Sequence, residues 1–142
     1  MDSMDVFMDA EDCIAGRLAS VAAKELLKGR HVYIVNAEKA VISGNPKYTI
    51  SSTKEKVDRG DPYHGPFYPR RPDEMLKRSI RGMLPKKPRG RDALKRLKVF
   101  LSVPEELSGR EFVRPEVARN RLMGKYIETG KLSERLGARK TW

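Results

Sequence analysis

An unbroken run of β-branched and aromatic residues, Val32–Val35 (VYIV), constrains the fold more than any other stretch of the chain. Such a run is typical of a strand that is buried on both faces of a parallel sheet. Before it, Val6–Ala10 has the composition of a short strand, and apolar residues recur at helical spacing from Ile14 to Leu26, with Gly29 as the stop. Strand, helix and strand within about 30 residues predict a βαβ unit with a right-handed crossover.

The rest of the chain extends this mixed α/β pattern and shows no domain boundary, so we expect one domain over residues 1–142. Pro46 suits the first turn of a helix over 47–59. Strands are predicted over 99–103 and 126–128, and a last helical turn begins at Thr129 or Ser133 and stops at Gly137. Residues 104–124 are polar and irregular, with Pro115 opening a short helix that extends to Leu122.

Polar residues at two strand ends have more than one interpretation. Asp12 is placed to cap the first helix. Asn36, Glu38 and Lys39 follow the strand at 32–35, at the carboxyl end where open α/β sheets usually bind ligands. The alternative, which we favour, is that Asn36 caps the short turn 37–42 with its side chain.

Net charge is concentrated in Arg70–Lys98, which carries twelve Lys and Arg against three Asp and Glu, or +9 of the +11 of the whole chain. A charged face is usually solvated and held by ion pairs, but three acids cannot pair with twelve bases. Self-repulsion on this scale calls for a polyanion. We therefore expect a phosphate-binding surface whose affinity falls steeply with salt, by roughly 0.7–0.9 in log–log slope for each contact.

The basic stretch is ordered as helix, loop and helix. Leu76, Ile80, Met83 and Leu84 share one stripe of a helix that begins near Pro72 or Asp73 and stops before Pro85. Lys86–Gly90 is predicted to be a non-helical loop because of its Pro and Gly residues. A second short amphipathic run follows, with Ala93, Leu94 and Leu97 on its apolar side. The bases outside the apolar stripes are Arg70, Arg71, Lys77, Arg78, Arg81, Lys86, Lys87, Arg89, Arg91, Lys95 and Arg96.

Aromatic residues in two other places leave two interpretations open. Residues 60–69 (GDPYHGPFYP) form a connection without regular structure, in which Tyr63, His64, Phe67 and Tyr68 either stack on unpaired bases or pack as a cover over the sheet edge. Trp142, in the basic tail, either anchors that tail to the body or stacks on a base.

Other function classes find little support. The acidic N-terminus lacks the features of a secretory signal, no apolar run is long enough to span a membrane, and the single cysteine, Cys13, suggests a reducing, cytoplasmic compartment. His31 and His64 lack metal-ligand spacing, and residues 124–131 do not match a phosphate-binding loop. For Cys13, a buried structural role is favoured over a reactive thiol.

The sequence favours RNA binding over two alternative functions, those of an enzyme and of a DNA-binding module. An enzyme would have to be a phosphate-handling α/β protein with Asp9, Asp12 or Glu38 as metal ligands, and no cluster of convergent carboxylates is evident. A DNA-binding module would present a continuous helix to base edges. Pro85 and Pro88 interrupt the basic segment, which suits a path along folded RNA better.

Two long motifs in order carry a family resemblance. DAEDCIAGRLASVAAKELLKG at 9–29 with VNAEKAVISG at 35–44, and RGMLPKKPRGRDALKRLKVF at 81–100, closely resemble the universal L-thirteen family of large-subunit ribosomal proteins in its archaeal and eukaryotic form. The ending LGARKTW at 136–142 is similar to archaeal members, and 104–124 is the least family-like part.

The resemblance implies a three-layer α/β/α domain around a small, mainly parallel four-stranded sheet, with the basic helix-loop-helix as an extension. It implies binding to large-subunit rRNA, early subunit assembly, a cytoplasmic location in the large subunit, neighbouring large-subunit ribosomal proteins as partners, and no catalysis or small-molecule substrate. No cofactor is expected, with Mg²⁺ present only as part of the rRNA. By resemblance the phosphate contacts come from Arg81, Lys86, Lys87, Arg89, Arg91, Lys95 and Arg96.

Overall fold

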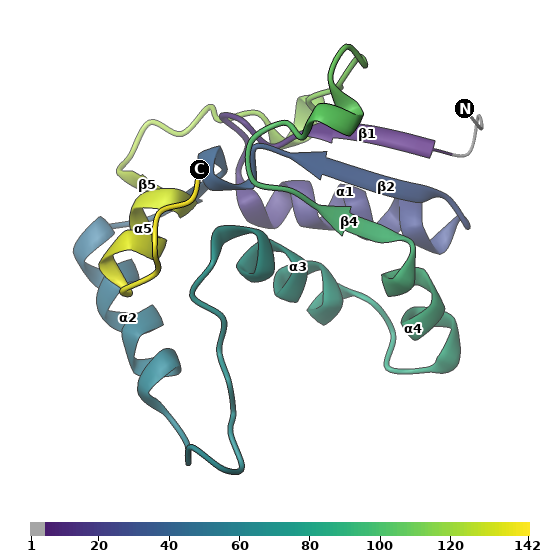
Figure 1. Cartoon of the computed structure of the whole chain (residues 1–142). Helices are drawn as coiled ribbons and strands as arrows, with labels where there is room; N and C mark the ends of the chain where they lie inside the picture. The colour runs from purple at the N-terminus through teal and green to yellow at the C-terminus, as the bar shows by residue number, and fades with distance from the viewer. Residues whose placement is uncertain (1–4) are drawn as a thin grey trace.

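The computed structural model describes residues 5–142 and contains both helices and strands (Figure 1). Its elements in order are β1 (Asp5–Asp9), α1 (Ala15–Leu27), β2 (His31–Val35), the 3₁₀ turn η1 (Ala37–Lys39), β3 (Val41–Ser43), α2 (Pro46–Asp58), α3 (Pro72–Met83), α4 (Pro88–Lys95), β4 (Leu97–Val99), the 3₁₀ turns η2 (Glu105–Leu107) and η3 (Glu116–Ala118), β5 (Tyr126–Glu128) and α5 (Thr129–Arg135).

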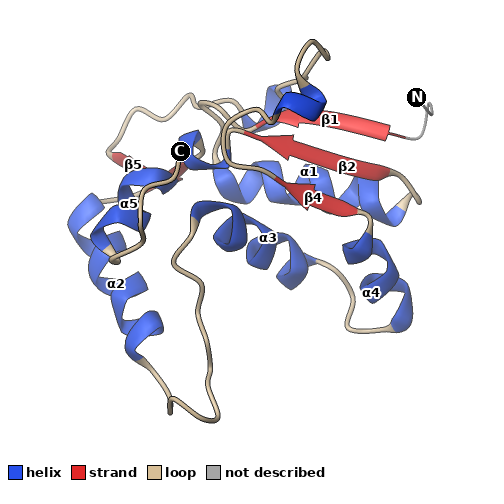
Figure 2. Ribbon diagram, in the orientation of Figure 1, coloured by secondary structure: helices blue, strands red, loops and turns tan. Residues whose placement is uncertain are grey.

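The main sheet has three parallel strands in the order β1-β2-β4, with β2 in the centre (Figure 2). Val32 and Ile34 of β2 are fully buried, as the uninterrupted apolar run predicts. β4 begins two residues before the predicted strand at 99–103 and ends at Val99. The predicted fourth strand of this sheet is instead paired elsewhere, because β3 and β5 form a separate antiparallel ladder.

The two faces of the main sheet differ. Val32 and Ile34 point into a core that also contains residues of α1 and α3, among them Leu18 and Ile80. On the opposite face, Phe7 and Tyr33 are half-buried and stack on each other with their ring centroids 5.0 Å apart. Residues of the segment 104–124 cover Phe7 on that face, where Phe112 meets its ring edge-on and the Arg110 guanidinium carbon lies 5.3 Å from the ring centroid.

The irregular segment 104–124 protects the outer edge of β1. The Val113 N–H donates to the Phe7 carbonyl at 3.0 Å, and the Asp9 N–H donates to the Val113 carbonyl at 3.1 Å. From the same segment, Phe112 meets Phe7 edge-on at 6.0 Å. An exposed strand edge is a site for unwanted pairing with other chains, and this segment satisfies its hydrogen bonds.

A second, smaller cluster is formed by β3, β5, α2, α5 and one residue of α3. Met75, Ile127, Leu132 and Leu136 are its buried members. β5 and α5 lie where the sequence predicts them, and Gly137 ends α5 with a φ of +92°. The tail returns to α5, since a Cβ at Gly130 would lie 3.1 Å from the Trp142 Nε1. The structure therefore favours the anchoring role of Trp142.

The first residues of α2 and α1 confirm the predicted place of Pro46 but not the predicted capping role of Asp12. The Asn45 side chain accepts a hydrogen bond from the Lys47 N–H at 3.0 Å, and Pro46 occupies the first turn of α2, as predicted. Asp12 does not cap α1, whose N-cap is Ile14. Asp12 has a φ of +55°, and its carboxylate accepts from the Asn120 side chain at 3.1 Å.

The prediction that Asn36 caps the following turn is also wrong. Asn36 has a left-handed backbone with a φ of +58°, and its side chain turns back to donate to the Asp9 Oδ1 at 3.0 Å. A tertiary partner on the neighbouring strand replaces the local one. The residue thereby joins the carboxyl ends of β1 and β2.

The burial of α3 yields a stability prediction. Ile80 is fully buried, whereas Met83, three residues further on, is 45% exposed. Replacing Ile80 with Ala should cost about 2–5 kcal/mol of unfolding free energy, because it removes buried methyl groups and leaves a cavity. Met83→Ala on the same helix should cost less than about 1 kcal/mol. Urea unfolding followed by circular dichroism measures both, and equal losses would contradict the packing described here.

Candidate nucleic-acid interface

The amphipathic sequence of α3 fixes the direction of its bases. Leu76 and Ile80 are buried in the main core, so the residues on the other side of the helix must face solvent. Lys77, Arg78 and Arg81 are exposed there. Asp73 and Glu74 lie in the first turn, where the helix dipole favours acids.

The turn between α3 and α4 is shorter than the sequence predicts. α3 ends at Met83, and α4 begins at Pro88. The predicted non-helical loop over 86–90 is therefore wrong in its second half. Pro88 occupies the first turn of α4, where its fixed φ suits a helix and its missing N–H has no helical partner to lose.

Gly90 sets the distance between this turn and α4. It is buried, and a Cβ at this position would lie 1.8 Å from the Pro85 carbonyl oxygen. No side chain fits at that distance, so the close approach requires glycine. As a result, the backbone at Pro85 lies directly against the first turn of α4.

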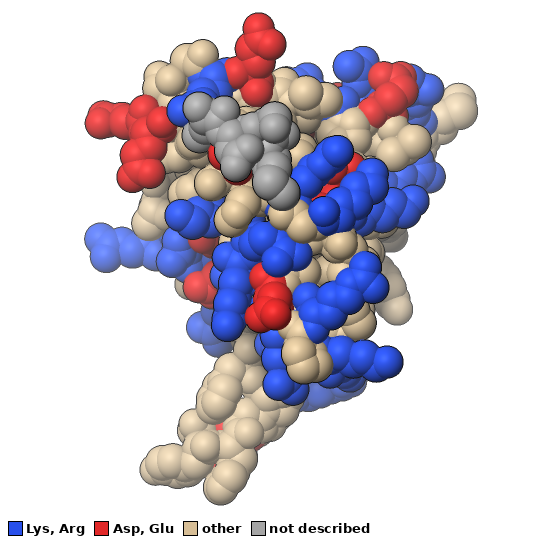
Figure 3. All heavy atoms as spheres, turned by 90° about the vertical axis from the view of Figure 1, so that its right-hand side faces the viewer, with Lys and Arg blue, Asp and Glu red and all other residues tan. Residues whose placement is uncertain are grey.

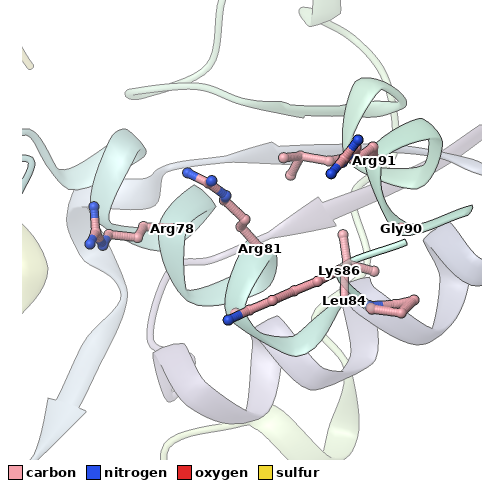
Figure 4. A pocket seen from close by; sticks show the side chains of 9 residues that line it. Arg78, Arg81, Leu84, Lys86, Gly90 and Arg91 are labelled. Carbon is pink, nitrogen blue, oxygen red and sulfur yellow. The ribbon is translucent and has the colours of Figure 1, made fainter. Parts of the chain in front are cut away.

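A hollow of about 460 Å³ lies between α3, the turn and α4. Arg81 from α3, Lys86 from the turn and Arg91 from α4 border it (Figure 4). Its floor includes Leu84, which is buried, and Gly82. Arg78 also lines the hollow but extends away from Arg91, and its guanidinium carbon lies 5.0 Å from the centroid of the Tyr68 ring.

We call this surface the α3–α4 basic face and define it by the exposed bases of α3, the turn and α4. Two nearby bases are paired, Arg71 with Asp73 at 3.2 Å and Lys95 with Asp92 at 4.0 Å. Seven others make no ion pair within residues 5–142, namely Lys77, Arg78, Arg81, Lys86, Lys87, Arg89 and Arg91. Figure 3 shows Lys and Arg gathered over the side of the molecule where α4 lies.

Three predicted contact residues lie outside the α3–α4 basic face. Arg96 is half-buried, and its guanidinium donates to the Leu26 carbonyl at the end of α1 at 2.7 Å. Tyr68 is half-buried and packs against the smaller cluster. His64 lies in the loop between α2 and α3, with its Nδ1 3.5 Å from Asp61. Arg70 is exposed at the end of that same loop.

The carboxylates considered as metal ligands have protein partners. Asp9 accepts from Asn36 and forms an ion pair with Arg114 at 3.3 Å. Glu38 is buried and accepts from the Ser102 backbone N–H at 3.0 Å, so it supports the fold and does not face a ligand. Within residues 5–142 no group of three or more His, Cys, Asp or Glu side chains is positioned to hold a metal ion.

Cys13 has the structural role that the sequence favours. It is fully buried at the junction of β1 and α1, and its Sγ lies 3.4 Å from the Asp9 carbonyl oxygen. Burial raises the pKa of this thiol from 9.0 to about 11, and the negative charge of Asp9 adds to the effect. A thiol with a raised pKa is a poor nucleophile at neutral pH.

A small α/β body with a dense, unneutralised basic face is typical of proteins that bind polyanions. None of the helices described is long and apolar enough to cross a membrane. Comparison with known proteins shows which family of such polyanion-binding proteins the chain belongs to. Residues 3–106 match the family model for ribosomal protein L13, so the chain belongs to that family. The match ends close to the start of the irregular segment 104–124.

Individual relatives extend the similarity over nearly the whole chain. The large ribosomal subunit protein uL13 of Methanosarcina barkeri is 51% identical, with 93% of this chain and 97% of that protein covered. The uL13 of Archaeoglobus fulgidus is 48% identical, covering 93% and 87%. The uL13 of Haloarcula marismortui is 46% identical, covering 97% and 94%.

Membership of this family confirms several predictions made from the sequence. The predicted resemblance is confirmed, and the named relatives are of the predicted archaeal type. The chain is a structural protein of the large ribosomal subunit and not an enzyme, and its location is the cytoplasmic ribosome.

The close approach of Gly90 to Pro85 predicts that alanine at this position lowers the stability of the fold, and alanine at Gly82, the control, is expected to raise it. Gly90→Ala should destabilise the fold by about 1–3 kcal/mol, because the new Cβ forces the Pro85 backbone away. Gly82→Ala, on the exposed side of α3 with no atom near its Cβ position, should stabilise by about 0.5–1 kcal/mol through helix propensity. Thermal unfolding of the two variants measures this, and a neutral Gly90→Ala would refute the contact.

Burial of Cys13 predicts a loss of stability at alkaline pH. The folded-state pKa is raised, so the contribution of the neutral thiol is complete below pH 9 and is lost as the pH rises toward about 11. The rise of the thiol pKa from 9.0 to about 11 corresponds to roughly 2–3 kcal/mol of unfolding free energy. Unfolding free energies at pH 8 and pH 11 should therefore differ more for the natural chain than for Cys13→Ala. Parallel curves would show that the thiol ionises freely in the folded state.

Proposed function

We propose that this protein binds large-subunit rRNA through the α3–α4 basic face and thereby fixes the relative positions of neighbouring RNA segments. The observation that carries the proposal is that seven exposed bases, without ion pairs within residues 5–142, lie on α3, on α4 and on the turn between them, and that both helices pack on a common core. Their charge is uncompensated within the described residues, and a ribosomal location supplies the polyanion.

The arrangement of the basic side chains supports recognition of the shape of the RNA backbone rather than of the RNA base sequence. Lys86 and the two guanidinium groups of Arg81 and Arg91 border one hollow from three different segments. Guanidinium groups bind phosphate oxygens in a bidentate manner, so groups on separate segments favour a phosphate path that bends between α3 and α4. Lys87 and Arg89, exposed at the start of α4, extend the same path.

Preorganisation reduces the entropy that binding costs. Pro69 and Pro72 precede or open α3, and Pro85 and Pro88 restrict the turn to α4. The close packing of Gly90 against Pro85 supports a turn that has its shape before RNA binds. Little backbone ordering then remains to be done when phosphates arrive.

The proposed contact residues are the seven unpaired bases together with Arg70, Arg71 and Lys95. Arg96, Tyr68 and His64 are left out because Arg96 is bonded to α1, Tyr68 is packed in the smaller cluster, and His64 lies on the separate α2–α3 loop. Fixing RNA segments relative to one another would aid early subunit assembly. It requires no cofactor beyond the Mg²⁺ that belongs to folded rRNA, and it leaves the remaining surface for neighbouring ribosomal proteins.

The proposal predicts the behaviour of a triple variant. Changing Lys86, Lys87 and Arg89 together to Ala should weaken binding to a large-subunit rRNA transcript and flatten the log–log salt dependence by about 2–3, if each residue makes one phosphate contact. Thermal unfolding should hardly change, because all three side chains are exposed. Filter binding at several salt concentrations measures the slope.

A variant of equal charge loss provides the control. Lys47, Lys54 and Arg59 are exposed on or just beyond α2, away from α4. Their joint replacement with Ala should change the slope less. If both triple variants lose the same affinity, binding depends on net charge alone and the assigned face is wrong.

A further inference from the structure

A second pocket, of about 260 Å³, lies between α2, α3 and α5, at the end of the molecule away from α4 (Figure 1). Part of its lining is apolar, because Met75, Leu76 and Leu132 border it and are buried in the two clusters. The pocket is smaller than the roughly 300–1,000 Å³ of sites that bind drug-sized ligands. It therefore suits a single ring system rather than a peptide segment.

The α2 side of this pocket is polar, where a helix packed on a core is normally apolar. The lining residues from α2 fall at helical spacing on one side of the helix, and they are Tyr48, Thr49, Ser52, Thr53 and Lys56. Within residues 5–142 the hydroxyl groups of Thr49, Ser52 and Thr53 make no hydrogen bond. Thr53 is only 8% exposed. Polar groups in such enclosed places normally have partners, so these hydroxyls are available to a ligand.

The lining favours a flat group that has apolar faces, a polar edge and a negative charge nearby. The apolar side chains from α3 and α5 suit the faces of such a group, and the hydroxyls of α2 both donate and accept hydrogen bonds at its edge. Among the described residues that line the pocket none is Asp or Glu, whereas Lys56 adds a positive charge. A nucleobase has this shape and carries a phosphate with it. An aromatic protein side chain has a similar shape but brings no negative charge.

Tyr68 joins this pocket to the α3–α4 basic face. Its ring lines the pocket, with the Lys56 Nζ 5.8 Å and the Arg78 guanidinium carbon 5.0 Å from the ring centroid. Arg78 also lines the hollow between α3 and α4, and Ser79, the next residue on α3, lines the pocket. A strand whose phosphates follow the basic face to Arg78 therefore passes close to the pocket. Tyr68 forms a wall there without holding a phosphate itself.

We propose that this pocket receives one unpaired base of the rRNA strand whose phosphates lie on the α3–α4 basic face. The inference rests on the proposed function, since the basic face brings the strand to Arg78. The base lies against Met75 and Leu132, and its edge bonds to the hydroxyls of Thr49 and Ser52. Because a hydroxyl both donates and accepts, the pocket recognises that a nucleotide is unpaired rather than which base it carries.

A variant that fills the pocket tests the base contact. In the full-length chain, Ser52→Phe occupies the pocket without removing a charge. Its affinity for a folded large-subunit rRNA transcript should fall about tenfold, which corresponds to 1.4 kcal/mol. The log–log salt slope should stay at its natural value, because no phosphate contact is lost. Filter binding at several salt concentrations measures both quantities.

A matched control lies one residue earlier on α2. Ser51 is exposed and does not line the pocket, so Ser51→Phe should bind the transcript as the natural chain does. Chemical probing of the base edges with dimethyl sulfate, kethoxal and a carbodiimide gives a second readout on the same complexes. The natural chain and Ser51→Phe should protect one unpaired base that stays reactive with Ser52→Phe.

A milder variant covers the case in which the phenylalanine disturbs α2. Thr49→Val combined with Ser52→Ala removes two hydroxyls and little volume. It should weaken binding about three- to tenfold through the lost hydrogen bonds and leave the same base reactive. Thermal unfolding of each variant shows whether the fold is retained.

Two results would overturn the base contact. One is equal affinity and equal base protection for Ser52→Phe and Ser51→Phe. The other is a Ser52→Phe chain that binds the protein-free transcript normally but is not retained in reconstituted subunits, because the pocket would then hold a neighbouring protein. Failure of the proposed function differs from both: the joint variant of Lys86, Lys87 and Arg89 would keep the natural salt slope, whatever the affinity of Ser52→Phe.

Discussion

The structure depends on the burial of one side of α3 against two apolar clusters at once. Leu76 and Ile80 enter the main core beside β2 and α1, while Met75, one residue away on the helix, enters the smaller cluster with Leu132. Consecutive residues of a helix point about 100° apart, so one helix can face both clusters. α3 thus links the main sheet to the β3–β5 unit. Two sides of the helix are buried in the two clusters, and its charged residues lie on the remaining, exposed side. The positions of Lys77, Arg78 and Arg81 follow from that packing.

Much of the fold could be predicted because the decisive signals are local. The run Val32–Val35 identifies the central strand, and the helical repeat ending before Gly29 identifies α1. What could not be predicted depends on tertiary partners. Asn36 and Asp12 were assigned local capping roles, but each finds an acceptor or donor far along the chain, Asp9 and Asn120. Local rules describe the helix ends only when no such partner competes.

The candidate site was predictable in composition but not in shape. The count of charged residues along the sequence shows which segment carries the bases. The apolar stripes of its helices then indicate that the bases lie on the solvent side. The hollow between α3 and α4 depends on Pro88 starting a helix and on Gly90 touching Pro85, and a Pro-Gly-rich sequence equally suggests a loop. Arg96 shows the same limit, because its bond to the Leu26 carbonyl spans 70 residues and has no signal in the neighbouring sequence.

The position of Trp142 has a practical consequence for experiments on the isolated chain. It is the only tryptophan, and its indole nitrogen lies beside Gly130 of α5. Indole emission therefore reports the surroundings of α5, whereas backbone ellipticity reports every helix. If the two clusters separate before the main core opens, emission will change at a lower denaturant concentration than ellipticity does. The C-terminal residue thus serves as a built-in optical probe of whether α3 holds both halves together until the whole chain unfolds.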